Sequence, residues 1–329
     1  MDSSRRIPAQ TSHAIAYLRF LACMMIVTCH FFQAYDNDWA YVLNTGVQIF
    51  LLISGFLYGY TGVTDIPRFY SGRIRKVYLP YILWTMIISF LLIAFAYDHF
   101  NIRVAVAQIL MVGRMDGQSH LWFIPVLFIC YLILPVFTLI RNRTLSLSAL
   151  LVFVLILSGI YAITGEADYL WIMTYFIGFI LGMVPNICKA LFIPIVILVA
   201  FMLFDTPVLE LFTDKSFAGR VIHILSALGI LCLCIVVADV MHGKSGKYPP
   251  PRLLLSRKHP SWLGKFEFEV YLVHQTFLIG PLALVYITDN RIFNIIICIL
   301  AIGVTTLLFC ILKKKFLDIK FRLPSKIRV

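Results

Sequence analysis

The chain alternates long apolar runs with short polar stretches along its whole length. A helix of about 20 apolar residues crosses the hydrocarbon core of a bilayer, whereas the strands of a membrane barrel alternate over about 9–11 residues. The pattern therefore predicts an all-α, polytopic membrane protein with about ten transmembrane helices. The predicted spans are residues 14–35, 40–61, 77–97, 119–140, 145–163, 168–185, 188–204, 219–241, 266–287 and 291–312. A further apolar piece, 104–112, is too short to span and is read as interfacial or re-entrant.

Composition supports the same fold class. The chain is 61% hydrophobic and only 13% charged, whereas a soluble domain is usually about 45–50% apolar. The eight cysteines lie mostly inside the apolar runs and form no CxxC pair, so they are interpreted as small hydrophobic residues, and no metal site is expected. The net charge of +12 is confined to short loops and the C-terminus, a pattern of membrane topology rather than of nucleic-acid binding.

The basic residues also predict the orientation. With the N-terminus in the cytoplasm, most of the 28 Lys and Arg residues fall on the cytoplasmic side. Both termini are therefore predicted to be cytoplasmic. The whole chain, 1–329, is expected to form one integral-membrane domain, with an N-terminal tail at 1–13 and a basic C-terminal tail at 313–329. The few basic residues on the outer side are Arg103, Arg114, Lys215, Arg220 and Arg291.

The first predicted span carries two ionisable residues, Arg19 and His30. Eleven residues of helix advance about 16.5 Å and turn through about 1100°, so both side chains lie on one stripe. Ionisable groups inside a span are costly and are functional candidates by default. The alternatives are an Arg19 that reaches back to the lipid headgroups and a His30 that bonds a neighbouring helix.

Three later stretches also carry candidate chemistry. Ser54 and Gly55 lie inside the second span, where small residues equally allow close helix packing. The stretch RFYSGRIRKVYLPY, residues 68–81, offers basic groups that suit phosphate, or it is a plain cytoplasmic loop. His120 opens the fourth span at its outer end and is either a cavity histidine, at a depth similar to His30, or an interfacial anchor.

These four elements in this order, together with FEFEVYLVHQTFL at 266–278, resemble the acyltransferase-3 family of membrane-bound acyltransferases. Its hallmarks are an Arg followed eleven residues later by His, a Ser-Gly-Phe element, a basic loop and a His-Leu-Trp-Phe start to a later span. The chain departs from the family in its basic loop, where Arg-x-x-Arg becomes Arg73-Ile74-Arg75-Lys76, and in Glu267 and Glu269. Short members of this kind resemble the O-acetyltransferases that modify O-antigen of lipopolysaccharide, exopolysaccharide or related bacterial glycans.

The resemblance implies acetyl-CoA from the cytoplasm as the acyl donor. Arg73, Arg75 and Lys76 are then expected to hold its phosphates, and Arg19 to neutralise a phosphate or guide the pantetheine arm. In this interpretation Arg19 and His30 lie at the two ends of the path along which the pantetheine arm carries the thioester.

The resemblance likewise implies roles at the reacting end. His30 is expected to act as the base for an acceptor hydroxyl, or to carry the acyl group as an acyl-imidazole. His120 is a second base or a donor to the oxyanion, and Ser54 a donor to the thioester carbonyl.

The expected partners are a glycan acceptor, which is polyprenyl-linked in one version of the hypothesis, and membrane lipids, with no nucleic acid. The expected location is the bacterial inner membrane. A second hypothesis is a transporter or flippase of polyprenyl-linked glycan, although no internal repeat is visible. The third is a membrane scaffold. The sequence allows an oligomer, because Gly178 and Gly182 form a small-xxx-small pair that packs either within the bundle or between protomers.

Overall fold

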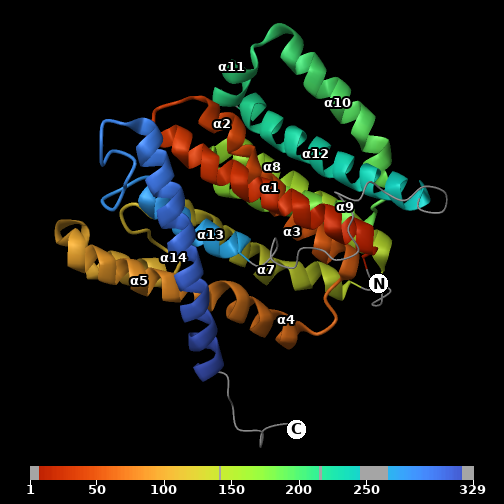
Figure 1. Ribbon diagram of the computed structural model, residues 1–329. Helices are drawn as coiled ribbons and strands as arrows, with labels where there is room; N and C mark the ends of the chain where they lie inside the picture. Colours follow the sequence, from red (N-terminus) through yellow and green to blue (C-terminus); the bar gives the residue numbers. More distant parts are fainter. Residues whose placement is uncertain (1–6, 141, 215–216, 245–265, 321–329) are drawn as a thin grey trace, which may run out of the picture. The chain divides into compact units, whose positions relative to one another are not determined.

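The computed structural model describes residues 7–140, 142–214, 217–244 and 266–320, and every regular element in these ranges is a helix (Figure 1). Eight of the described helices are long and apolar enough to cross a membrane. This confirms an all-α, polytopic membrane protein. The eight are Thr11–Ala34, Trp39–Thr61, Ile66–Phe95, Ser119–Leu139, Arg143–Thr164, Ile187–Phe204, Gly219–Val240 and Arg291–Leu317.

Two predicted spans take a different form. The span at 168–185 is α9 (Ala167–Met183), an apolar helix of 17 residues that is shorter than the other eight. The continuous helix predicted for 266–287 is wrong. It is interrupted, with α13 (Glu267–Val273) followed by the 3₁₀ turn η4 (His274–Phe277) and then by turns. Gly280 and Pro281 explain part of this, because neither residue favours a helix interior.

Two helices extend into the predicted tails. Helix α1 (Ala9–Ala34) begins inside the stretch taken as the N-terminal tail. Helix α14 (Arg291–Lys320) continues past residue 313 because its lysines are good helix formers. The basic loop at 245–265 and the last nine residues lie outside the described residues.

Contacts group the chain into two compact units. The first comprises Met1–Ile66 and Val126–Lys265, and the second comprises Pro67–Pro125 and Phe266–Val329.

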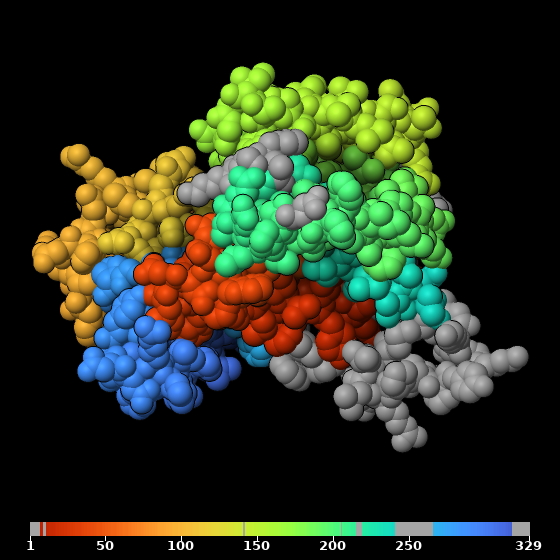
Figure 2. All heavy atoms as spheres, turned by 90° about the horizontal axis from the view of Figure 1, so that it is seen from above, coloured from red at the N-terminus to blue at the C-terminus, as the bar shows by residue number. Residues whose placement is uncertain are grey.

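The first unit is built around α3 (Thr45–Thr61), which contacts α1, α9 and α12. The other helices of this unit pack on these: α8 on α9, α10 and α11 on α12, and α2 on α1. In Figure 2 the blue-green residues of α11 and α12 lie against the red residues of α1 and α2. The bounds of these helices are α2 (Trp39–Leu43), α8 (Arg143–Thr164), α10 (Ile187–Asp205), α11 (Val208–Thr213) and α12 (Phe217–Lys244).

Glycines allow α3 and α9 to approach closely. A Cβ atom at Gly55 would lie 1.9 Å from the carbonyl oxygen of Tyr175, and one at Gly178 would lie 2.2 Å from that of Leu52. Gly59 and Gly182 make equally close approaches one turn further along each helix, so the two helices run parallel. The Gly178–Gly182 pair therefore packs within the unit, which is the first of the two interpretations, packing within the bundle or between protomers.

The second unit contains α4 (Ile66–Arg73), the π turn η1 (Ile74–Tyr78) and α5 (Leu79–Phe95) in one helical run. It also contains α13, η4 and α14. The remaining elements are η2 (Tyr97–His99), α6 (Ile102–Ile109), η3 (Ser119–Trp122) and the first residues of α7 (Phe123–Leu139), which continues into the first unit.

The interrupted segment runs antiparallel to α14 (Figure 1). Glu269 pairs with Lys313, the Cys298 thiol donates to the Phe277 carbonyl over 3.4 Å, and Asn294 donates to the Val285 carbonyl over 2.9 Å. Along α14, the step from Asn294 to Lys313 is about 28 Å at 1.5 Å per residue. Since a hydrocarbon core is about 30 Å thick, the segment is long enough to cross it as an interrupted helix.

The short piece predicted at 104–112 forms α6 and packs along α5. Gln108 donates to the Thr85 hydroxyl over 3.1 Å, and the Tyr78 hydroxyl donates to the Ile109 carbonyl over 3.1 Å. Thr85 lies in the middle of α5, and Tyr78 lies directly before its start. The chain therefore turns back along this helix after Phe95. These contacts favour the re-entrant interpretation of residues 104–112 over the interfacial one.

Candidate functional site

His120 lies deep in the second unit. The neighbouring Gln118 accepts a hydrogen bond from the Trp84 indole over 3.3 Å and donates to the Thr276 hydroxyl over 3.0 Å. Trp84 is near the middle of the helical run from Ile66 to Phe95, and it packs edge-on against Phe309 of α14. His120 therefore lies near mid-depth of this unit, deeper than the outer end expected from its place at the start of a span.

Two glycines let the chain before His120 cross the chain after η4. Gly117 and Gly280 have φ values of +71° and +108°, which residues with side chains rarely adopt. A Cβ atom at Gly280 would lie 2.4 Å from the Cα atom of Gly117. The two non-helical stretches therefore touch backbone to backbone.

The interrupted helix holds His120 from three sides. The His120 amide donates to the Gln275 side-chain oxygen over 3.0 Å, and the Tyr271 hydroxyl donates to the His120 carbonyl. The His120 ring donates from Nε2 to the Leu272 carbonyl over 3.3 Å, because a carbonyl oxygen is only an acceptor. Backbone and ring are thus both positioned by residues 271–275.

A second imidazole lies against the first. The ring centroids of His120 and His274 are 4.9 Å apart, and both side chains are buried. His274 Nδ1 donates to the carbonyls of Tyr271 and Val270, over 2.8 and 3.1 Å. The sequence signal for this residue is the run His274-Gln275-Thr276, three polar residues in the middle of an apolar stretch. The resemblance includes this run, but it assigns no role to His274.

We call the buried polar residues where the two stretches meet the polar crossing: Gln118, His120, Tyr271, His274, Gln275 and Thr276. In membrane proteins, non-helical backbone at depth occurs where protein buries it or where it lines a water-filled cavity. The polar crossing combines such backbone with a dense set of hydrogen-bonding side chains. Both features are typical of substrate sites in helical membrane proteins.

The basic residues gather on the first turns of the same unit. Arg73 lies over the Phe69 ring, with its Cζ atom 5.8 Å from the ring centroid, while Arg75 and Lys76 are exposed. The π turn, in which the Leu79 amide bonds the Ile74 carbonyl, precedes Pro80. A proline ring clashes with the carbonyl four residues earlier, which explains the wider turn at this place.

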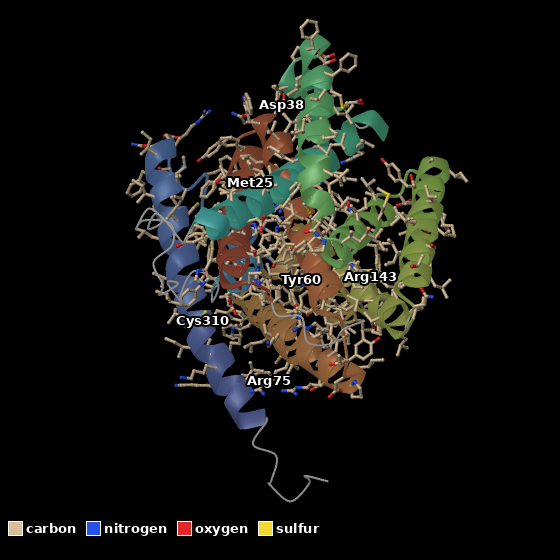
Figure 3. All side chains as sticks on the ribbon, turned by 90° about the vertical axis from the view of Figure 1, so that its right-hand side faces the viewer. Met25, Asp38, Tyr60, Arg75, Arg143 and Cys310 are labelled. Atoms are coloured by element: carbon tan, nitrogen blue, oxygen red, sulfur yellow. The ribbon has the colours of Figure 1, made fainter. Side chains whose placement is uncertain are left out.

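This basic end also includes the C-terminal turns of α14. Figure 3 shows Arg75 and the end of α14 beyond Cys310 on the same side of the second unit. The exposed Lys314 and Lys315 lie there. From Lys76 to Trp84 the helix rises by about 12 Å, so the basic end and the depth of His120 are separated by that distance along α5.

The other candidates lie in the first unit. Arg19 and His30 are both half-buried on α1, and His30 Nδ1 donates to the Gln33 side-chain oxygen over 2.6 Å. The first turn of α3 packs against the middle of α1, where a Cβ atom at Gly46 would lie 2.7 Å from the Ala22 carbonyl oxygen.

From that contact α3 runs back along α1, and Ser54 lies eight residues, or about 12 Å, further on. Figure 3 shows Asp38 and Tyr60 toward opposite ends of this α2–α3 run. Ser54 therefore lies toward the Arg19 end of α1, and the first unit does not bring it to His30.

Comparisons with known proteins identify the family. A family model described as an acyltransferase domain matches residues 12–313. No curated protein and no solved structure matches the chain. Because the matched region covers nearly the whole sequence and includes Arg73, Arg75 and Lys76 as well as the polar crossing, the chain belongs to the acyltransferase-3 family and is a multi-pass membrane acyltransferase.

Proposed function

We propose that the protein transfers an acetyl group from cytoplasmic acetyl-CoA to a hydroxyl of a bacterial surface or lipid-linked glycan, in the inner membrane. The observation that carries the proposal is the acyltransferase-domain match over residues 12–313. The acetyl donor, the glycan acceptor and the bacterial membrane follow from the resemblance to short O-acetyltransferases.

The donor is proposed to enter at the basic end. CoA is a polyanion, and charge-assisted contacts from arginine to phosphate are among the strongest in proteins. Arg73, Arg75 and Lys76 lie within about one turn of the helical run there, and Arg75 and Lys76 face outward. The long pantetheine arm can extend from such a site toward the polar crossing, which lies about 12 Å further along α5.

In the first unit, His30 is the proposed base. Its Nδ1 donates to Gln33, so the neutral ring carries its lone pair on Nε2. That nitrogen takes the proton of the acceptor hydroxyl, or is itself acylated in the relay alternative. Arg19 is proposed to guide the donor. The Ser54 hydroxyl is proposed to donate to the thioester carbonyl as the donor passes the Arg19 end of α1, before the thioester reaches the position where it reacts.

For His120, the geometry supports the role of a base over that of a donor to the oxyanion. Its Nε2 proton is engaged by the Leu272 carbonyl, so the neutral ring offers an acceptor nitrogen, Nδ1, and no second proton. A donor role would require the charged imidazolium.

The experiment compares membranes containing wild type with membranes containing His30→Ala at equal expression. Labelled acetyl-CoA is supplied, and label is measured in lipid-linked and surface glycan. We expect incorporation by wild type and a loss of about 100-fold or more in the variant, the usual effect of removing a general base. Label that is independent of His30 would keep the enzyme and move the base to His120.

A transporter or flippase is the second candidate, because interrupted helices with polar residues also form transporter binding sites. The segment 267–287 has that form. Folded wild-type protein that incorporates no label with any glycan acceptor would favour this candidate over the acetyltransferase.

A further inference from the structure

We propose that His274 is the proton-relay partner of His120, so that the two imidazoles act as one acid–base pair at the polar crossing. The proposal rests on the proposed acyl transfer and adds to it a positioning residue that acts through His120. Three observations carry it: the distance between the rings, the hydrogen bonds that orient them, and the interruption of the helix at His274.

The first observation is contact. The two ring centroids are 4.9 Å apart with an angle of 71° between the planes, and both rings are buried. Two imidazolium ions at this distance would repel each other strongly in a medium of low dielectric constant. The pair therefore holds one proton more readily than two, and the two rings are in edge-on contact.

The second observation is the orientation of each ring by backbone carbonyls. His120 donates from Nε2 to Leu272, and His274 donates from Nδ1 to Tyr271 and Val270. In the neutral form the acceptor nitrogens are therefore His120 Nδ1 and His274 Nε2. Fixing one nitrogen as a donor to a carbonyl is the usual way in which a protein makes the other nitrogen basic.

The third observation is where the helix stops. Helix α13 ends at Val273, and the chain continues as the 3₁₀ turn that begins with His274. The interruption places Gln275 on the His120 amide and Tyr271 on the His120 carbonyl. The same short segment thus holds His120 by its backbone, by its ring and by the edge-on contact with His274.

In the reaction, the acceptor oxygen forms a bond to the acyl carbon and the carbon–sulfur bond of the thioester breaks. In the alternative in which His120 rather than His30 is the base, His120 takes the hydroxyl proton and His274 shares it. The pair then returns this proton to the departing thiolate, which leaves as the free thiol of CoA. One hydroxyl proton ends on one sulfur, so the histidine pair is unchanged after each turnover.

The test uses two variants that remove the basic nitrogen, one of which keeps a donor for the Tyr271 carbonyl. In His274→Asn, the side-chain amide can still donate to the Tyr271 carbonyl but has no basic nitrogen. In His274→Ala, a cavity of imidazole size is left. His99→Asn is the matched control, because His99 is an exposed histidine whose bond is to Asp116. All are assayed in full-length protein for label transfer from acetyl-CoA to glycan, and for thermal stability.

We expect His274→Asn to lower the transfer rate at least about tenfold while the unfolding midpoint stays near that of wild type. We expect added imidazole to restore severalfold activity to His274→Ala, and pyrazole, which has the same shape but is far less basic, to restore none. His99→Asn should keep the wild-type rate.

Three results would overturn the proposal. Wild-type rates in His274→Asn would show that the second base is not needed. Equal rescue of His274→Ala by pyrazole and imidazole would show that the ring only fills space. No transfer by folded wild type would remove the proposed function and this inference with it, a result distinct from the first two.

Discussion

Which nitrogen of a histidine can accept a proton is decided by the bond that the other nitrogen makes. His30 donates to a side-chain amide in the first unit, whereas His120 and His274 donate to backbone carbonyls in the second. The pattern of apolar and polar residues predicted that His30 and His120 are chemically important, but it carries no information about these partners. Residues that are close to one another only after folding, such as His120 and Leu272, have no signature in a single sequence.

The basic end leads to a prediction for single side chains. Replacing Arg75 and Lys76 together by glutamine should raise the KM for acetyl-CoA about tenfold or more, because each charge-assisted bond to phosphate contributes about 1.5–3 kcal/mol. The kcat should change little, since these side chains bind the donor at a distance from the reacting carbon. Steady-state transfer rates at varied acetyl-CoA concentration measure both constants.

Lys314 and Lys315 provide the matched control for that double variant. They are exposed at the same end of the second unit and carry the same charge. Glutamine at both positions should leave the KM within about twofold of wild type, the effect of general surface charge alone. An equal rise in KM for the two double variants would mean that the basic end attracts anions without a specific phosphate site.

At the scale of elements, the contact between α3 and α9 depends on the absence of side chains. A methyl group at Gly55 or Gly178 would overlap a carbonyl oxygen of the facing helix, so the helices would have to separate. We expect Gly55→Ala and Gly178→Ala each to destabilise the protein by about 1–3 kcal/mol, which thermal unfolding in detergent would show as a lower midpoint.

A third glycine separates packing from helix propensity. Gly159 lies inside α8, and a Cβ atom there would meet no atom within 4 Å. Gly159→Ala should therefore leave the unfolding midpoint unchanged or slightly raised, because alanine favours a helix more than glycine does. A drop in Gly159→Ala as large as that in Gly55→Ala would contradict the close-packing explanation.

Long apolar runs predicted the helices well and the interruptions poorly. Runs such as 14–35 and 291–312 became continuous helices because nothing in them competes with helical hydrogen bonding. The run 266–287 has a similar apolar content, yet it breaks at His274, where the side chains of Gln275 and Thr276 bond to the stretch around His120. Hydropathy averages over such residues, so the site itself was the part of the fold that the pattern could not predict.

At the scale of the whole molecule, the candidate residues divide between the two units. Arg19, His30 and Ser54 belong to the first, and the basic end and His120 belong to the second. Spacing along α1 correctly placed Arg19 and His30 on one helix, because a helix transmits sequence distance directly into space. It could not show that His120 has its own histidine partner 154 residues further along the chain, since only tertiary packing creates that contact.

Orientation in the membrane is the remaining property of the whole chain that the sequence predicts. If 267–287 crosses the bilayer as an interrupted helix, the residues before and after it must lie on opposite sides. Single cysteines can test this at Asp65 and Asp289, which are both exposed aspartates, and at Ser256 in the basic loop that charge places in the cytoplasm. The native cysteines lie inside helices, where an impermeant maleimide has little access.

We expect Asp289→Cys to react with the impermeant maleimide in intact cells, and Asp65→Cys and Ser256→Cys to react only after permeabilisation. Labelling of Asp289→Cys and Ser256→Cys from the same side would mean that the interrupted segment enters and leaves on one side. Reaction of Asp65→Cys in intact cells would reverse the predicted orientation. In that case the basic end would face away from cytoplasmic CoA, and the proposed direction of acyl transfer would have to be abandoned, while the internal geometry of the polar crossing would stand unchanged.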